Sequence, residues 1–179
     1  MRKNVVVISS SLRVNSNSEI LAKEFVKGAK RNSNVELINL KDYEIQYFKG
    51  CLACQNTGRC VIDDGVKDII DKVKNADVIV FTTPIYYYSI SGQLKTLLDR
   101  LNPLYVSDYK FREIYLITTC ADTDENAING SKSVIEGWVE CFPKSKLVKT
   151  FCGLDCNLGK DVLQHQELLD GVRKIGEKI

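Results

Sequence analysis

Residues 5–18, VVVISSSLRVNSNS, are the stretch that decides the fold of this chain. The first four residues are all β-branched and apolar, which is typical of a strand buried on both faces of a parallel sheet. A polar, turn-rich segment follows, and from Ser18 onward apolar residues recur at helical spacing. A buried strand that leads through a polar loop into a helix predicts an α/β fold.

The same alternation continues along the chain. Further strands are predicted at residues 35–40, 78–81, 114–117 and 147–151, with helices between them and a last helix over residues 159–178. One of these helices starts at an N-cap formed by Asp63 or Asp64, and another carries Lys95, Asp99 and Arg100 in an expected surface ion pair. Five strands that alternate with helices imply parallel crossovers and a three-layer α/β sandwich. Ligands of such sheets bind beyond the carboxyl ends of the strands.

Length and composition fit a single globular domain. Of the 179 residues, 44% are hydrophobic and 27% are charged, which excludes disorder and collagen-like repeats. The formal net charge of +2 argues against a dedicated nucleic-acid binder. No apolar run approaches the roughly 18 residues of a membrane span, and no signal peptide is recognised, so we expect a cytoplasmic protein. The 7 cysteines therefore require an explanation other than a disulfide framework.

The loop after the first strand is rich in groups that bind phosphate. It carries one cation and several hydroxyl or amide donors just before a helix N-terminus, namely Ser11, Arg13, Ser16, Asn17 and Ser18. A phosphate monoester needs such converging donors, and the helix adds backbone N–H groups and a favourable dipole. The alternative is a helix N-cap followed by a solvated polar turn. Neither G-x-x-x-x-G-K-[ST] nor G-x-G-x-x-G is present, which argues against a nucleotide P-loop and the usual dinucleotide fingerprint.

The loop after the third strand is aromatic. Residues 82–95 read TTPIYYYSISGQLK, and three successive tyrosines cannot all point into the core. Aromatic rings at the carboxyl edge of a sheet can form a wall for a flat heteroaromatic ligand, with backbone groups contacting its polar edge. A packed interface loop with solvated hydroxyls is the alternative. The two loops together favour a flat ring system that bears a phosphate.

These two loops, with the motif Leu98-Asp99-Arg100, resemble the NADPH-dependent FMN reductase family of the flavodoxin-like superfamily. The resemblance implies one flavodoxin-like FMN-binding domain over residues 1–179, with a parallel sheet of order 2-1-3-4-5. It also implies FMN as cofactor, NAD(P)H as reductant, a small-molecule electron acceptor and a homodimer or homotetramer. No catalytic side chain is implied, because the flavin carries the hydride.

The resemblance also assigns the residues that would bind the cofactor. The phosphate would be held by Ser11, Arg13, Ser16, Asn17 and Ser18, and the isoalloxazine would be lined by Pro84, Ile85, Tyr86, Tyr87, Tyr88 and Ser89. Thr119 and Cys120, within residues 118–121, would form the other side of the site. The family usually has glycine where Ser10 stands, a position at which glycine suits a tight turn.

Cys51, Cys54 and Cys60 form a separate group with the spacing C-x2-C-x5-C. This segment, with Asp63 and Asp64, resembles a subgroup of iron–sulfur flavoproteins, whose motif has a further cysteine where Thr57 stands. A four-iron cluster needs four thiolates, so a cluster, a zinc ion, a disulfide and free thiols near the flavin all stay open. We expect Cys141, Cys152 and Cys156 to be packing residues.

The function that best fits the residues is an FMN-binding NAD(P)H-dependent oxidoreductase of the FMN, quinone or nitro reductase type. The alternatives are a flavodoxin-like electron carrier and an iron–sulfur flavoprotein. Small flavodoxins are often strongly acidic, and a net charge of +2 counts against the carrier. The sequence leaves the acceptor and the choice between NADH and NADPH open.

Overall fold

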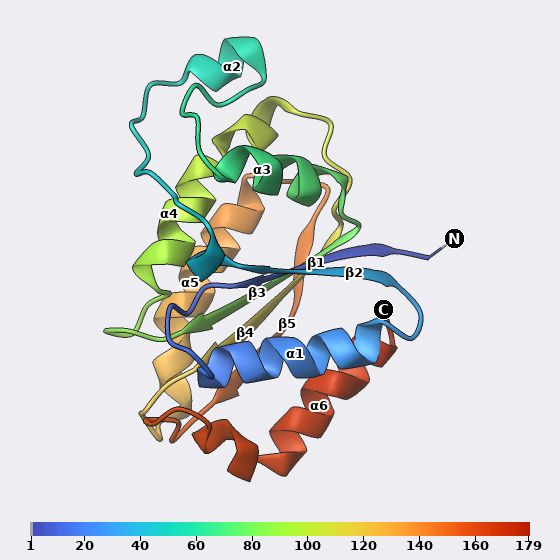
Figure 1. Ribbon diagram of the computed structural model, residues 1–179, viewed down its shortest axis with the longest axis vertical. Helices are drawn as coiled ribbons and strands as arrows, with labels where there is room; N and C mark the ends of the chain where they lie inside the picture. Colours follow the sequence, from blue (N-terminus) through green and yellow to red (C-terminus); the bar gives the residue numbers. More distant parts are fainter. Residues whose placement is uncertain (1) are drawn as a thin grey trace.

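The five predicted strands pair into one parallel sheet in the computed structural model of the protein, which describes residues 2–179. The order of the strands is β2-β1-β3-β4-β5, which confirms the predicted flavodoxin-like arrangement (Figure 1). The strands are β1 (Asn4–Ser9), β2 (Asn34–Asn39), β3 (Val78–Pro84), β4 (Glu113–Thr119) and β5 (Lys146–Gly153).

Helices cover both faces of the sheet (Figure 1). On one face lie α1 (Asn17–Ala29) and α6 (Gln166–Glu177), and on the other lie α3 (Val66–Asn75), α4 (Gly92–Arg100) and α5 (Asn129–Glu140). Val5 and Val7 of β1 pack with the first pair, whereas Val6 and Ile8 pack with the other three helices. The β-branched run that decided the fold is therefore buried on both sides, as predicted. No helix within residues 2–179 is long and apolar enough to cross a lipid bilayer.

Some local structure differs from the prediction. The connection 41–62 contains a short helix, α2 (Ala53–Thr57), which is flanked by Leu52 and Gly58 with φ angles of 54° and 68°. Five residues are too few to show helical periodicity in the sequence. The predicted helix over 159–178 is interrupted, because a 3₁₀ turn at Asp161–Gln164 precedes α6. Further 3₁₀ turns lie at Leu40–Asp42, Asn102–Val106 and Glu125–Ile128. The first of these turns follows directly on β2, which therefore ends at Asn39 and not at the predicted residue 40.

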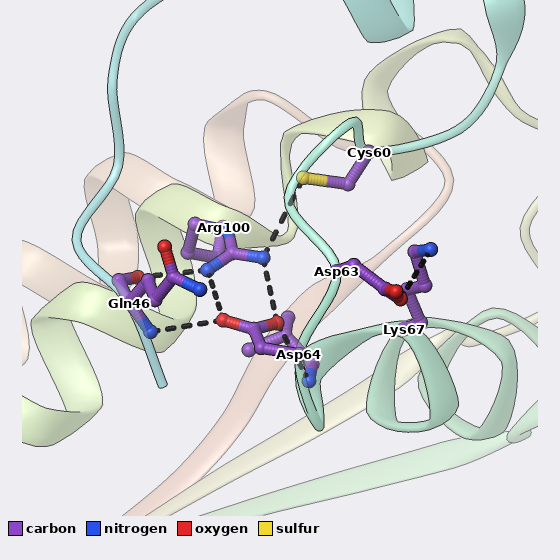
Figure 2. Close-up of polar contacts among 7 residues, drawn as sticks. Gln46, Cys60, Asp63, Asp64, Lys67 and Arg100 are labelled. Atoms are coloured by element: carbon purple, nitrogen blue, oxygen red, sulfur yellow. Dashed lines mark hydrogen bonds and ion pairs between the residues drawn. The ribbon is translucent and has the colours of Figure 1, made fainter. Parts of the chain in front are cut away.

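A buried ion pair anchors the connection 41–62 to the core (Figure 2). Arg100 donates two hydrogen bonds to Asp64, of 2.7 and 2.9 Å, and a third of 2.7 Å to the carbonyl oxygen of Gln46. The Arg100 side chain is fully buried, so the prediction of a surface ion pair is wrong for this residue. Lys95 and Asp99 do form the exposed pair, at 2.7 Å. Asp64 also accepts from the backbone N–H of Val66 at 3.1 Å. The N-cap of α3 is nevertheless Gly65, so the prediction of Asp63 or Asp64 as the N-cap is wrong by at least one residue.

Candidate cofactor site

The loops that follow β1, β3, β4 and β5 enclose a pocket of about 220 Å³ at the carboxyl edge of the sheet. Ten of its lining residues come from the predicted site, and they are Ser11, Arg13, Ser16, Asn17, Ser18, Pro84, Ile85, Tyr86, Thr119 and Cys120. The structure therefore brings the two loops and the turn after β4 together. A larger hollow of about 530 Å³ lies between Gly58 and α3, but none of the predicted cofactor residues lines it.

The N-terminus of α1 presents free donors to this pocket. Ser16 caps the helix by accepting a hydrogen bond from the backbone N–H of Glu19 at 3.2 Å. The backbone N–H groups of Asn17 and Ser18 make no hydrogen bond within residues 2–179. The Ser18 hydroxyl is buried and also has no partner among these residues. A buried hydroxyl without a partner costs about 1–3 kcal/mol, so the end of α1 is built to receive an acceptor from a ligand.

Ser11 and Arg13 continue this donor surface along the loop. Ser11 is buried, and its hydroxyl oxygen accepts a hydrogen bond from the backbone N–H of Arg13 at 3.3 Å. The Arg13 guanidinium reaches the carbonyl oxygen of Asn157 at 3.5 Å, across the mouth of the pocket. Arg13 is the one charged residue that lines the pocket in the described part of the chain. The lining thus has the positive charge that a phosphate group requires.

Asn17 has a role that differs from the predicted one. Its side-chain amide donates to the carbonyl oxygens of Cys156 and Leu158, at 3.2 and 2.7 Å, and accepts from the backbone N–H of Val162 at 3.2 Å. The amide is therefore used to fasten the loop after β5, and only the backbone N–H of Asn17 is left to face a ligand. The sequence analysis did not assign the loop after β5 to the site, although ligands of such sheets bind beyond the carboxyl ends of the strands. The lining residues that it missed are Cys156 and Asn157, whereas Ala121 lies in the predicted turn 118–121.

A buried chain of hydroxyl groups joins the two predicted loops. Ser91, the N-cap of α4, donates to the Ser10 hydroxyl at 2.9 Å, and Ser10 donates to the carbonyl oxygen of Thr82 at 3.0 Å. The Ser91 backbone N–H in turn donates to Thr83 at 3.0 Å. Ser10 thus makes a contact between loops that the glycine expected at its position could not make.

The three tyrosines form a tight hairpin rather than a flat wall. The backbone N–H of Tyr86 donates to the carbonyl oxygen of Ser89 at 3.0 Å, and the backbone N–H of Ser89 donates to the carbonyl oxygen of Tyr86 at 3.1 Å. Tyr87 and Tyr88 lie at the tip with φ angles of 49° and 60°, the pattern of a type I′ turn. The Tyr87 side chain is fully exposed, and neither it nor Tyr88 nor Ser89 lines the pocket. The backbone N–H groups of Ile85, Tyr86 and Ser89 bond within the protein, whereas those of Tyr87, Tyr88 and Ile90 have no acceptor among residues 2–179.

The remaining wall contains thiols. Cys120, just after β4, and Cys156, after β5, are both buried and both line the pocket. Burial raises the pKa of the Cys120 thiol to about 12 and that of Cys156 to about 11. Both thiols are therefore protonated at neutral pH, and this side of the pocket carries no charge.

Cys51, Cys54 and Cys60 line a different cavity, of about 10 Å³, and do not contribute to the pocket. The Cys54 sulfur accepts a hydrogen bond from Asn102 at 3.1 Å, and the Cys60 sulfur accepts one from Arg100 at 3.5 Å (Figure 2). Within residues 2–179, no group of three or more His, Cys, Asp or Glu side chains is placed to hold a metal ion. The arrangement does not support the suggested metal role of these thiols. Cys141 is exposed, so its predicted place in the core is wrong.

Together, the fold and the site define the class of protein. A five-stranded parallel sheet of order β2-β1-β3-β4-β5 carries a helix N-terminus with unpaired donors at its carboxyl edge, beside the point where the strand order reverses. This combination is that of a flavodoxin-like protein with a donor-rich pocket at the usual place for a ligand.

Comparison with known sequences identifies the family. A sequence model of the NADPH-dependent FMN reductases matches residues 3–122, and the chain belongs to that family. It is 39% identical to an iron-sulfur flavoprotein of Methanocaldococcus jannaschii over 101 residues, which are 56% of this chain and 52% of the relative. It is 31% identical to an NAD(P)H-dependent FAD/FMN reductase of Geobacillus thermodenitrificans over 99 residues, 54% of this chain and 50% of that one. The chain thus spans about half the length of these curated relatives.

A solved structure supports the fold. The NAD(P)H:quinone oxidoreductase of Methanothermobacter marburgensis superposes with a TM-score of 0.77, covering 99% of this chain and 97% of its own, at 14% sequence identity. The family predicted from the two loops is therefore confirmed, and FMN and NAD(P)H are the cofactors of that family.

Proposed function

We propose that this protein binds FMN in the pocket at the end of α1 and uses NAD(P)H to reduce a small-molecule acceptor, such as a quinone, a nitro compound, free flavin or a metal ion. The observation that carries the proposal is the set of unpaired donors at one point. The buried Ser18 hydroxyl, the backbone N–H groups of Asn17 and Ser18 and the Arg13 cation converge where a phosphate would bind. When bound, FMN supplies the hydride chemistry.

The chain's own residues would bind and orient the cofactor. Pro84, Ile85 and Tyr86 form one side of the pocket, and Thr119, Cys120 and Ala121 form another. The free backbone N–H groups of Tyr87 and Tyr88 lie at the hairpin tip outside the lining of the pocket, and would contact the polar edge of a ring that extends beyond it. No carboxylate or imidazole from residues 2–179 lines the pocket, which fits a reaction whose hydride transfer needs no acid or base from the protein.

Titration with FMN tests the binding site directly. The purified protein is expected to quench FMN fluorescence on binding, and Ser18→Ala and Arg13→Met are each expected to weaken binding about tenfold, as for the loss of one hydrogen bond to a charged group. Ser133→Ala, at an exposed position of α5, is the matched control and should bind like the unchanged protein. Absence of FMN binding by the unchanged protein would overturn the proposal.

Anaerobic addition of NADPH separates the enzyme from an electron carrier. Rapid bleaching of the bound flavin absorbance is expected for the reductase. FMN that binds but is not reduced at a useful rate would favour the flavodoxin-like carrier instead. Iron and zinc analysis of an anaerobically purified sample tests the third alternative, suggested by the name of the relative from M. jannaschii. The cysteine arrangement leads us to expect neither metal in stoichiometric amount.

We further propose that the chain is one FMN-binding domain over residues 1–179 that acts in the cytoplasm as a homodimer or homotetramer. Large apolar side chains lie exposed on loops that flank the pocket, including Leu12, Val14 and Tyr87, and these support self-association. Light scattering after size-exclusion chromatography measures the mass directly. A monomeric mass at micromolar concentration would contradict the association.

A further inference from the structure

Two cysteine thiols lie within reach of each other in the wall of the candidate pocket. The sulfur atoms of Cys120 and Cys152 are 3.9 Å apart, and both residues are free thiols. Cys152 lies in β5 opposite Thr118 of β4, and Cys120 follows Thr118 by two residues. Since side chains two residues apart point to the same face of a sheet, both thiols emerge on one face.

We propose that Cys120 and Cys152 form a dithiol–disulfide pair that exchanges two electrons with the occupant of the pocket. The proposal rests on FMN being that occupant. On oxidation two S–H bonds break and one S–S bond forms, while the two electrons and two protons released reduce the flavin. In the reverse direction, flavin reduced by NAD(P)H returns two electrons and two protons to the disulfide.

The position of the pair restricts which molecules can reach it. Cys120 lines the pocket, whereas Cys152 lies behind it and does not. Cys120 is buried and Cys152 is partly buried. Burial raises the pKa of Cys120 to about 12 and also raises the pKa of Cys152. Protonated thiols react slowly with thiol reagents in bulk solvent, and thiols of high pKa are poor leaving groups for small thiols that attack the disulfide. Of the two thiols, Cys120 is therefore the one that a molecule bound in the pocket would contact.

The surrounding contacts link this pair to the shape of the site. The Cys120 sulfur lies 3.6 Å from the carbonyl oxygen of Asp122, and the Asp122 carboxylate accepts a hydrogen bond from the Tyr88 hydroxyl at 3.1 Å. The Cys120 carbonyl oxygen accepts from the backbone N–H of Cys156 at 2.7 Å. A disulfide to Cys152 removes the S–H that Cys120 donates to Asp122, so oxidation breaks a contact in the wall of the pocket.

The first experiment measures the disulfide and needs no cofactor. The folded apoprotein is oxidised with excess diamide by long incubation at alkaline pH, because the protonated thiols react slowly at neutral pH. Free thiols are then alkylated, and unreduced peptides are mapped by mass spectrometry. We expect a peptide pair linked through Cys120 and Cys152, abolished by Cys152→Ser and retained in Cys141→Ser. The second variant removes an exposed thiol that donates to the carbonyl oxygen of Gly137 at 3.6 Å. Cys152→Ala serves if the serine variant fails to fold. A folded protein that retains both thiols, or links other cysteines instead, overturns the proposal.

The second experiment measures the exchange with flavin. The FMN-loaded disulfide form is titrated anaerobically with NADPH, and full reduction is expected to consume about two equivalents per flavin, against about one for Cys152→Ala. One equivalent for both proteins overturns the coupling to flavin. If no FMN binds, the proposed function and the coupling both fail, while the mass measurement still decides whether the disulfide forms. The two failures are therefore distinguishable.

Discussion

At the scale of the residue, Ser10 shows how one hydroxyl can hold a site together. It receives a hydrogen bond from Ser91 and donates one to Thr82, and thereby joins the loops after β1 and β3. Replacement by alanine leaves the buried Ser91 hydroxyl without its acceptor, so we expect Ser10→Ala to lower the free energy of unfolding by about 1–3 kcal/mol.

Urea unfolding measures this loss of stability. If Ser10 also positions the cofactor, the binding of FMN changes as well. We expect Ser10→Ala to weaken FMN binding and to shift the visible spectrum of bound FMN, whereas Ser10→Thr should restore the spectrum in part. A variant that loses stability but binds FMN with an unchanged spectrum would show that the hydroxyl is structural only.

Tyr87 is held in a backbone conformation that disfavours its side chain. Its φ angle is 49°, its side chain is fully exposed, and a left-handed conformation costs an L-residue about 1–2 kcal/mol. We therefore expect Tyr87→Asn, whose side chain tolerates this region, to raise the free energy of unfolding by about 1 kcal/mol. Thermal or urea unfolding tests this. An unchanged or lower stability would mean that the tyrosine ring makes a stabilising contact that outweighs the strain.

At the scale of the element, two glycines allow α1 and α6 to pack closely. A methyl group at Gly176 would overlap the carbonyl oxygen of Phe25, and one at Gly28 would overlap that of Arg173. Gly176→Ala is therefore expected to destabilise the protein by about 1–3 kcal/mol. Gly137→Ala is the matched control, because nothing lies within 4 Å of a methyl group there and alanine favours the helix by about 1 kcal/mol. Opposite signs for the two variants in urea unfolding are the expected result; equal effects would contradict the packing.

The pair of Asp64 and Arg100 should make stability depend on pH. Burial opposes ionisation of Asp64, but the hydrogen bonds from Arg100 and from the backbone N–H groups of Gln46 and Val66 outweigh it and lower the pKa of Asp64. A carboxyl whose pKa is lowered by folding stabilises the protein above its unfolded pKa of about 3.9, and that contribution is lost as the pH falls through the folded value.

Asp64→Asn is accordingly expected to cost about 3–5 kcal/mol at neutral pH, because it leaves the buried Arg100 charge without its counterion. The cost should shrink as the pH falls below about 4. Asp63→Asn is the control: Asp63 is exposed and its pair with Lys67 lies at the surface, so an effect below about 1 kcal/mol is expected (Figure 2). A difference between the variants that does not vary with pH would rule out the ionic contribution.

The same elements show what the sequence could and could not reveal. The buried strands were predictable because continuous apolar runs such as residues 78–81, which begin with three β-branched residues, must be covered on both faces. The short helix α2 was not, since its ends depend on positive φ angles at Leu52 and Gly58 rather than on periodicity. The contacts of Asn17 with residues around 160 and of Arg100 with Asp64 join distant parts of the chain, so no local pattern indicates them.

At the scale of the whole molecule, the pocket is built from four loops, and a ligand there should stabilise the entire fold. The loops belong to β1, β3, β4 and β5, which are four of the five strands of one sheet. A ligand that binds only the folded state raises the free energy of unfolding by about 2.7 kcal/mol at a free concentration of 100 Kd. FMN is therefore expected to raise the Tm in a concentration-dependent way.

Riboflavin, which lacks the phosphate, provides the matched comparison. Since the donors at the end of α1 are directed at a phosphate, riboflavin should raise the Tm much less than FMN at the same concentration, and Ser18→Ala should reduce the difference between the two. Hydrogen exchange should slow mainly in the loop of residues 10–16 when FMN is added. Equal effects of riboflavin and FMN would mean that the cluster of donors around Ser18 does not recognise phosphate.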